Sequence, residues 1–270
     1  MNEAVALLGL LDDEAILLDE AALALAALDR PGIDLAPYHE RLGDMASEIF
    51  ARGARMTGAR DRAELLADVI ADDHGFHGDT DNYDDPANAD LISVMDRGQG
   101  LPVALSILYV ALARRVGWEA HPLNTPGHVL VRVGSEPAAV VQDPFAGGAV
   151  LDERGVARLI ARMLGNHVTP EPGHFVPLSN RSALVRLLSN QATRARRAGD
   201  LGRALELHER MTTFAPSYTA LWWERARIEQ LTGRAAAARA SLSAMMETTR
   251  DTVIRSRIRA ALDALARSTN

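Results

Sequence analysis

The stretch "GQGLPVALSILY", from Gly98 to Tyr109, predicts the buried helix around which we expect the rest of the chain to fold. Proline is well tolerated at the first position of a helix, because the N–H that it lacks has no helical partner there. From Pro102 to Val116 the sequence is almost wholly apolar, and a helix that is apolar on all sides is typical of a protein core. Gly117 ends the pattern. The stretch therefore predicts a central helix that begins at Pro102.

Two β-rich runs that follow this helix predict an antiparallel hairpin. The run "HVLVRV", from His128 to Val133, is separated by "GSEP" from the run "AAVVQD", which begins at Ala138 and ends at Asp143. A symmetric register around this four-residue turn places Val133 opposite Ala138. His128 then lies directly opposite Asp143, with about 5 Å between their Cβ atoms. Because a slip of one residue sends the two side chains to opposite faces, this register predicts an imidazole–carboxylate pair.

Helical patterns account for most of the first hundred residues. Asp12 or Asp13 is suited to cap a first helix, and Pro37 is suited to the first turn of a second helix. Asp61 is expected to cap a third helix, in which Glu64 holds the capping-box position. Three amphipathic helices are therefore expected before the buried helix, and a short helix with Leu91, Ile92, Val94 and Met95 is expected to lead into it.

The chain after Arg181 repeats a helical, alanine-rich pattern. Gly199 and Gly233 are 34 residues apart, and each is followed five residues later by an alanine, Ala204 and Ala238. This period and spacing are typical of tetratricopeptide repeats, which are helix–turn–helix units. We expect two such units, with a capping helix after the second.

The composition excludes several kinds of chemistry. The chain has no cysteine, which removes disulfides, thiolate metal ligands and thiol catalysis together. All 29 basic residues are arginine, so no lysine can form a Schiff base or bind phosphate in a P-loop. No positive charge precedes Arg30, and the longest largely apolar run has 11 residues, whereas a membrane span needs about 20. We therefore expect a cytoplasmic protein without a signal peptide or a membrane segment.

The charge is distributed unevenly along the chain. Residues 1–177 carry 13 arginines and 28 acidic residues, a net charge of −15, whereas residues 178–270 carry 16 arginines and 8 acidic residues, a net charge of +8. We predict that these two ranges are a first domain and a helical repeat region. Such a split indicates either a partner surface or two regions that attract one another. Because few aromatic side chains accompany the arginines, we expect an acidic peptide rather than nucleic acid as a partner.

Five short motifs together resemble one family. They are "GFHG" at residues 75–78, "YDDPAN" at 83–88, "GLP" at 100–102, "PGH" at 126–128 and "DPF" at 143–145. With the helices that follow, they resemble the bacterial SirB, or invasion-regulator, family of the transglutaminase-like superfamily over essentially the whole chain. The resemblance implies an α+β, mostly helical fold. It consists of a transglutaminase-like (papain-like) core with a small antiparallel sheet, followed by a short tetratricopeptide-type helical region.

The resemblance also implies what this chain lacks. Catalytic members carry a cysteine at the head of the helix that ends at Gly117, and counting back from that glycine places the cysteine at Pro102. His128 and Asp143 match the other two members of the triad. The family's usual hydroxyl, two residues after the proline, is replaced by Ala104. We therefore expect His128 and Asp143 to be a remnant dyad with a structural role. The chain is then a non-catalytic scaffold that binds a protein or peptide, without a cofactor.

Two catalytic alternatives stay open from the sequence. Ser106 lies one turn beyond Pro102, although a buried helical serine usually donates to a carbonyl of the preceding turn. His128 could instead act as a general base on water, oriented by Asp143, in a hydrolase or transferase. An open cleft that reaches His128 would favour chemistry or ligand binding. A sealed and hydrogen-bonded pair would favour a structural role.

The acidic loop from Asp72 to Asp90 is a second candidate site, because carboxylate clusters bind calcium or magnesium. The loop lacks the ligand spacing and the closing glutamate of an EF-hand. His74 and His77 are three residues apart, but Gly75 breaks the helix that would align them on zinc. We therefore expect no metal site, and a solvated loop with Asx turns. The family resemblance implies that this loop packs near the dyad.

Overall fold

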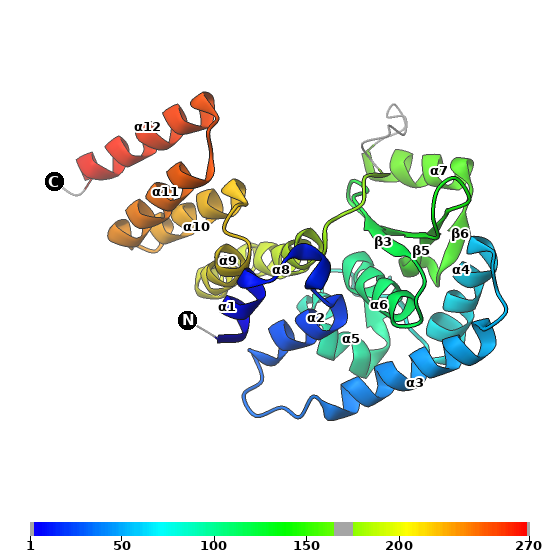
Figure 1. Ribbon diagram of the computed structural model, residues 1–270. Coiled ribbons are helices and arrows are strands. Elements are labelled where there is room, and N and C mark those ends of the chain that lie inside the picture. Colours follow the sequence, from blue (N-terminus) through cyan, green and yellow to red (C-terminus); the bar gives the residue numbers. More distant parts are fainter. Residues whose placement is uncertain (1–2, 165–174, 269–270) are drawn as a thin grey trace. The chain divides into compact units, whose positions relative to one another are not determined.

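Figure 1 shows the computed structural model of the chain, which describes residues 3–164 and 175–268. Its contacts divide the chain into two compact units. The core unit comprises residues 12–187, and the helical unit comprises residues 188–270 together with the N-terminal residues up to Leu11. The predicted fold class, α+β and mostly helical with a small antiparallel sheet, is confirmed. The predicted boundary between residues 177 and 178 concerns a change of sequence pattern and stays a prediction.

The core unit is built from helices that pack around a four-stranded antiparallel sheet. Its helices are α2 (Leu18–Ala27), α3 (Ala36–Gly53), α4 (Ala59–Ala67), α5 (Leu91–Arg97), α6 (Pro102–Arg115), α7 (Glu153–Leu164) and the first part of α8 (Asn180–Arg197). The strands follow in the order β3 (Ala120–Leu123), β4 (Leu130–Val133), β5 (Val140–Asp143) and β6 (Ala149–Leu151). A separate parallel pair consists of β1 (His77–Gly78) and β2 (Gln99–Gly100). Short 3-10 turns cover Asp13–Ala15, Pro86–Ala89 and Pro144–Ala146.

Helix α6 lies at the centre of the core unit, as its sequence predicts. It begins at Pro102, and every residue from Pro102 to Ala113 is buried. It ends at Arg115, shortly before Gly117, which takes a φ of +78° that favours glycine. Helix α6 packs against β3 and β4 on one face of the sheet, and α7 covers the other face with Leu159 (Figure 1). The sheet is therefore one layer between two helical layers.

The hairpin of β4 and β5 forms, but its predicted register is wrong. Val133 pairs with Val140 rather than with Ala138, so the connecting loop is two residues longer than the predicted turn. Because side chains alternate with a period of two, this shift leaves every residue on its predicted face. If the register is continued beyond the strands, His128 and Asp143 become diagonal rather than direct neighbours. Diagonal neighbours remain within reach of long side chains.

Two expected helix caps are also wrong. Asp13 does not cap α2, which begins after Leu17. Its carboxylate instead accepts hydrogen bonds from the backbone N–H groups of Asn180 and Arg181 at the start of α8, both at 2.8 Å. Asp61 was expected to cap α4 but lies inside the first turn of that helix, where its charge still suits the helix dipole.

Two features shape the helices that precede α6. Pro37 lies in the first turn of α3, as predicted from its fixed φ. Helix α4 continues into a π-helical turn over Asp68–Asp73, in which the N–H of His74 bonds to the carbonyl of Val69. Such turns are uncommon and often lie at functional sites. This one ends where the acidic loop begins.

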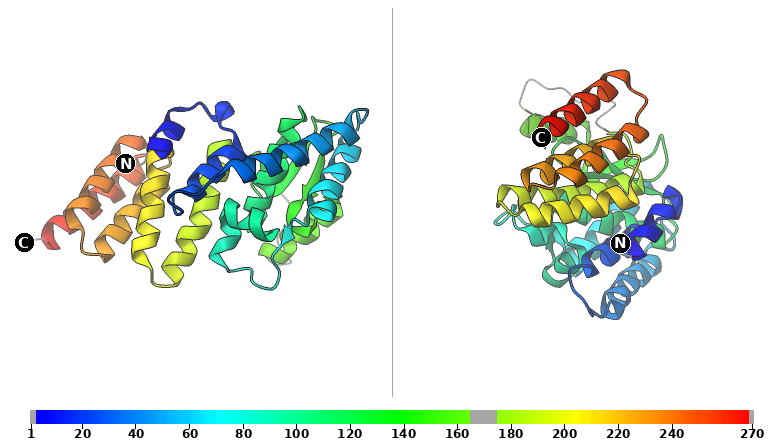
Figure 2. Two further views of the ribbon diagram at one scale, coloured as in Figure 1. Left: turned by 90° about the horizontal axis from the view of Figure 1, so that it is seen from below. Right: turned by 90° about the vertical axis from the view of Figure 1, so that its left-hand side faces the viewer.

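The helical unit is a stack of helices that run back and forth (Figure 2). It contains α1 (Glu3–Leu10), the second part of α8, α9 (Leu201–Phe214), α10 (Thr219–Leu231), α11 (Ala235–Thr248) and α12 (Thr252–Ser268). Gly199 and Gly233 take φ values of +80° and +75° in the turns after α8 and α10. The two predicted helix–turn–helix units and the helix after them are therefore present, whereas their tetratricopeptide assignment stays a prediction. Over residues 3–164 and 175–268, no helix has the length and apolar character that crossing a membrane requires.

Candidate functional site

His128 and Asp143 meet inside the core unit. His128 lies in the loop before β4, directly after Gly127, which takes a φ of +68°, and Asp143 is the last residue of β5. The Nε2 atom of His128 is 2.8 Å from Oδ1 of Asp143. The two residues are only 3 % and 5 % exposed. The structure therefore brings the two predicted site residues together in spite of the changed register, and it buries them both.

An aromatic cover lies over the imidazole. The carboxylate of Asp143 also accepts a hydrogen bond from the N–H of Phe145 at 3.0 Å, which fixes the turn after β5. The Phe145 ring is edge-on to His128, with 5.9 Å between ring centroids, and edge-on to Tyr83 at 5.7 Å. Gly78 leaves room for this ring, because a Cβ atom at Gly78 would lie 2.5 Å from it. The cover extends from the buried His128 to the exposed Tyr83.

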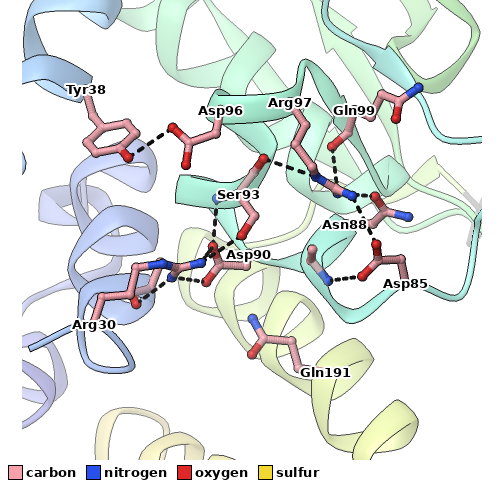
Figure 3. Close-up of polar contacts among 12 residues, drawn as sticks. Arg30, Tyr38, Asp85, Asn88, Asp90, Ser93, Asp96, Arg97, Gln99 and Gln191 are labelled. Atoms are coloured by element: carbon pink, nitrogen blue, oxygen red, sulfur yellow. Dashed lines mark hydrogen bonds and ion pairs between the residues drawn. The ribbon is translucent and has the colours of Figure 1, made fainter. Parts of the chain in front are cut away.

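Two arginines hold the loop that completes this cover (Figure 3). Arg97 donates to Oδ1 of Asn88 at 2.5 Å and to the carboxylate of Asp85 at 3.1 Å. Arg30 forms a bidentate pair with Asp90, with N–O distances of 2.8 and 2.9 Å. Because a bidentate arginine–carboxylate pair is both strong and directional, Arg30, just after α2, fixes the end of the loop at Asp90. Arg97, the last residue of α5, holds Asp85 and Asn88.

Three carboxylates of the acidic loop accept hydrogen bonds from nearby backbone N–H groups. Asp85 accepts from the N–H of Ala87, and Asp90 accepts from the N–H of Ser93 at the start of α5, both at 2.8 Å. Asp79 is buried and accepts from the N–H of Asn82 at 2.7 Å, and this hydrogen bond is the main reason that its pKa is lowered. Short-range hydrogen bonds of this kind were expected of Asx turns. Contrary to the expected solvated loop, part of the segment is buried.

The two histidines considered for zinc have separate contacts. His74 places Nε2 3.3 Å from the carboxylate of Glu48 on α3, whereas Nδ1 of His77 lies 2.9 Å from the carbonyl of Gly75. Among the described residues, no three or more His, Asp or Glu side chains are arranged to hold a metal ion. The two histidines therefore do not share a partner in this structure.

The head of α6 has no free side-chain nucleophile. Pro102 is buried at the first position of the helix. Ser106 is fully buried, and its hydroxyl donates to the carbonyl of Val129 at 3.1 Å. The expected hydrogen bond to the preceding helical turn is therefore wrong. The hydroxyl instead ties α6 to the residue that follows His128.

Sequence reasoning missed Arg186 of α8, which holds the segment that carries His128. Its guanidinium donates to the carbonyls of His128 at 2.7 Å and Thr125 at 3.0 Å, and to Oδ1 of Asn124 at 2.8 Å. Burial lowers the pKa of Arg186. Nothing in the sequence distinguishes this arginine from the others in the basic C-terminal region, because its partners lie about sixty residues away.

The interior beside the dyad is closely packed. Gln142 of β5 donates through Nε2 to the carbonyls of Ala63 at 2.6 Å and Gly148 at 2.8 Å. A Cβ atom at Gly148 would lie 2.7 Å from the hydroxyl oxygen of Tyr109. That hydroxyl is buried without a hydrogen-bond partner among the described residues, and burial raises the pKa of Tyr109. Sequence reasoning placed Tyr109 on the helix but gave no reason to expect an unpaired hydroxyl.

The chemical capacity of the site follows from this burial. A carboxylate at 2.8 Å orients an imidazole. One pocket of about 840 Å³ lies beside β5, β6 and α7, and another of about 490 Å³ lies beside β3 and the start of α8. Neither pocket is lined by His128 or Asp143. Because His128 and Asp143 are both almost fully buried and hydrogen-bonded to each other, the arrangement favours a closed pair over a base that meets a substrate.

Comparison with known proteins places this geometry in a family. A family model described as "Transglutaminase-like superfamily" matches residues 36–189. A UPF0162 protein of Xylella fastidiosa strain 9a5c is 28 % identical over 220 residues, which cover 78 % of this chain and 76 % of that protein. A UPF0162 protein of Pseudomonas aeruginosa is 30 % identical over 216 residues, which cover 80 % and 78 %. The human F-box only protein 21 is 29 % identical over 139 residues, which cover 48 % of this chain and 21 % of that protein.

The matched range includes the acidic loop, α6, the four-stranded sheet and the first half of α8. It therefore contains Pro102, His128, Asp143 and Arg186. Because the match covers more than half of the chain, the chain belongs to the transglutaminase-like superfamily.

Proposed function

We propose that this member of the transglutaminase-like superfamily is a pseudoenzyme that serves as a protein- or peptide-binding scaffold in the cytoplasm. We propose further that it is of the SirB type, with tetratricopeptide-type helices in its helical unit. The observation that carries the proposal is the state of the helix head and the dyad. Pro102 offers no nucleophile, the Ser106 hydroxyl is bonded to a carbonyl, and His128 is 3 % exposed beneath an aromatic ring.

In this proposal the dyad stabilises the fold. His128 connects the segment before β4 to Asp143, and Asp143 in turn fixes the turn that places Phe145 over the imidazole. Buried polar groups cost free energy unless they are paired, so the two side chains need each other. Removing the imidazole would leave the Asp143 carboxylate buried without its main partner.

The binding role rests on the surface of the helical unit. Helix α10 carries Trp223, which is partly buried against the core of the helical unit, and the guanidinium of Arg257 on α12 lies 4.9 Å from its ring centroid. Arg227, on the same helix as Trp223, has a side chain that is 52 % exposed. Stacked helical hairpins offer extended surfaces, and tryptophan and arginine are enriched at the energetic centres of interfaces. The excess of arginine favours a partner with an acidic segment.

A stability experiment separates the structural role from catalysis. His128→Ala is expected to lower the free energy of unfolding by about 1–3 kcal/mol, because a buried partner is lost. His39→Ala is the matched control, since the His39 side chain on α3 is 40 % exposed and makes only a surface contact with Glu20 at 3.3 Å, so its loss is expected to change stability by less than about 1 kcal/mol. Urea unfolding measures both variants. Hydrolysis of a p-nitrophenyl ester by the wild-type chain and His128→Ala should not differ.

The alternative function is a hydrolase or transferase in which His128 acts as a general base on water. The 2.8 Å contact with Asp143 is the observation that favours it, because a carboxylate at that distance orients an imidazole for proton transfer. Unchanged stability of His128→Ala together with loss of a defined turnover would establish this alternative and refute the scaffold proposal.

A cross-linking experiment tests the binding role. A photoreactive phenylalanine analogue is placed at Trp223, and in a second protein at Arg239, an exposed position on α11 that serves as the control. A specific adduct is expected from position 223 and not from position 239. The adduct should also be lost when Arg227 is replaced by glutamate. Equal adducts from both positions, or none from position 223, would contradict a binding face on α10.

A further inference from the structure

A pocket of about 490 Å³ lies on the core unit, away from the dyad, between β3 and the start of α8. Its residues come from four separate segments of the chain, namely Asp13 and Glu14, then Arg114, then Glu119 to His121, and finally Pro177 to Asn180. A volume of this size lies within the range of small-molecule sites, which is about 300–1,000 Å³. The pocket combines one arginine with three carboxylates.

Backbone hydrogen bonds hold the outer wall of this pocket. The N–H of Asn124 donates to the carbonyl of Val176 at 3.0 Å, and the N–H of Leu178 donates to the carbonyl of Pro122 at 2.7 Å. The segment before α8 therefore continues the sheet beyond β3. On the other side of the pocket, the Asp13 carboxylate accepts the N–H groups of Asn180 and Arg181 and so holds the start of α8 in place. The shape of the pocket is therefore set by the fold.

Arg114 of α6 is a partly buried cation with no ion pair. Its Nε donates to the carbonyl of Ala120 at 3.0 Å, and its Nη1 donates to Oδ1 of Asn180 at 2.8 Å. Both acceptors are neutral, and no carboxylate of the described residues lies within ion-pair distance of this guanidinium. The neighbouring Arg115 differs, because its guanidinium contacts Asp19 at 2.6 Å and a second carboxylate at 2.7 Å. Burial lowers the pKa of Arg114, and the charge of Asp13 opposes this effect without forming an ion pair with the guanidinium.

The carboxylates of the pocket differ in what they already bind. Glu119 is bonded to the hydroxyl of Ser135 and lies 3.4 Å from His121. Asp13 accepts the two N–H groups at the start of α8. Glu14 is exposed, and over the described part of the chain it has neither an ion pair nor a side-chain hydrogen bond. A cation without an ion pair and an exposed carboxylate without a side-chain partner among the described residues therefore line the same pocket.

We propose that this pocket binds a free α-amino acid with an apolar side chain. The ligand carboxylate pairs with Nη2 of Arg114, and the ligand ammonium group faces the acidic wall of Asp13 and Glu14. The side chain lies along Leu178 and its apolar neighbour Pro177. Charge-assisted hydrogen bonds of both signs then satisfy the two groups that the fold leaves unpaired. This inference is independent of the proposed scaffold function, because it concerns another part of the core unit.

Three matched probes test the need for both charges by isothermal titration calorimetry on the full chain. L-Leucine carries both groups, 4-methylpentanoate lacks the amine, and 3-methylbutylamine lacks the carboxylate. Leucine is expected to bind, and each of the other two at least about tenfold more weakly, because each loses one charged contact. Equal binding of leucine and 4-methylpentanoate would reduce the site to a carboxylate site and overturn the proposal. Failure of leucine to bind would overturn it as well.

Three variants locate the binding. Arg114→Gln removes the proposed carboxylate partner and is expected to abolish leucine binding. Glu14→Gln changes an exposed side chain, so it should fold normally and still weaken leucine binding several-fold. Arg115→Gln is the matched control, because Arg115 lies next to Arg114 but outside the pocket, and leucine should bind it as it binds the wild-type chain. Leucine binding that survives in both Arg114→Gln and Glu14→Gln would place the ligand elsewhere and refute the assignment.

Discussion

Acidification is expected to weaken the chain through His208 of α9. This histidine is buried in the helical unit, and its Nδ1 has no hydrogen-bond partner among the described residues. Burial is the largest reason that its pKa falls from 6.5 to about 4, and the nearby cations Arg196 and Arg225 act in the same direction. Glu224 opposes them without reversing the effect. His208 is therefore neutral in the folded chain at pH values where an unfolded chain protonates it.

The sign and size of the effect follow from these two pKa values. The folded pKa lies below the unfolded one, so the unfolded chain binds more protons between about pH 6.5 and pH 4. The stability that the neutral His208 allows is fully present above pH 6.5 and is lost as the pH falls toward 4. One pKa unit corresponds to about 1.4 kcal/mol, so the loss from this residue should be about 2 kcal/mol at pH 5 and about 3 kcal/mol at pH 4.

Urea unfolding at pH 7.5 and pH 5, followed by circular dichroism, measures this loss. His208→Gln keeps a polar side chain of similar size without a proton that titrates in this range, so its stability should fall less than that of the wild-type chain. The difference between the two losses should be about 2 kcal/mol. His39→Gln is the control, because the His39 side chain is 40 % exposed, and this variant should lose as much stability between the two pH values as the wild-type chain. An identical loss in His208→Gln and in the wild-type chain would refute the reasoning.

Three further predictions concern the core unit. Tyr109→Phe removes a buried hydroxyl without a partner and should raise the free energy of unfolding by about 1 kcal/mol, as measured in urea. Gly148→Ala should lower the free energy of unfolding by about 1–3 kcal/mol, because Gly148 has a φ of +78° and a Cβ would lie 2.7 Å from both Ala67 and the Tyr109 hydroxyl. In the Tyr109→Phe background, Gly148→Ala should cost less stability, because the hydroxyl is gone. Arg30→Ala breaks the bidentate pair with Asp90, so amide hydrogen exchange in the acidic loop should become faster while α7 stays unchanged.

The sequence predicted those parts of the fold that depend on local pattern. Helix α6 was located because its apolar run, Pro102 and Gly117 all lie within one segment. The helical hairpins were located because Gly199 and Gly233 mark their turns. The predicted hairpin register was wrong by two residues. The length of the connecting loop sets the register, and the alternating pattern of the strands does not reveal that length.

Contacts between distant segments were beyond the reach of the sequence. Asp13 looks like the cap of the helix that follows it, yet it caps a helix 167 residues away. Arg186 is one arginine among many, and its three acceptors become apparent only when the chain is folded. The predicted pair of His128 and Asp143 survived the register error because the error was an even number of residues.

The segment from Thr125 to Val129 gives the dyad a structural role that does not require a nucleophile. The segment leads into β4 in an irregular conformation, so its buried carbonyls need partners that a regular strand would provide. Arg186 of α8 supplies them for Thr125 and His128, and Ser106 of α6 supplies one for Val129. The His128 side chain adds a fourth tie, to the end of β5. These contacts come from three different elements, α6, α8 and β5, so the conformation of the segment depends on all three, whether or not a substrate ever reaches the imidazole.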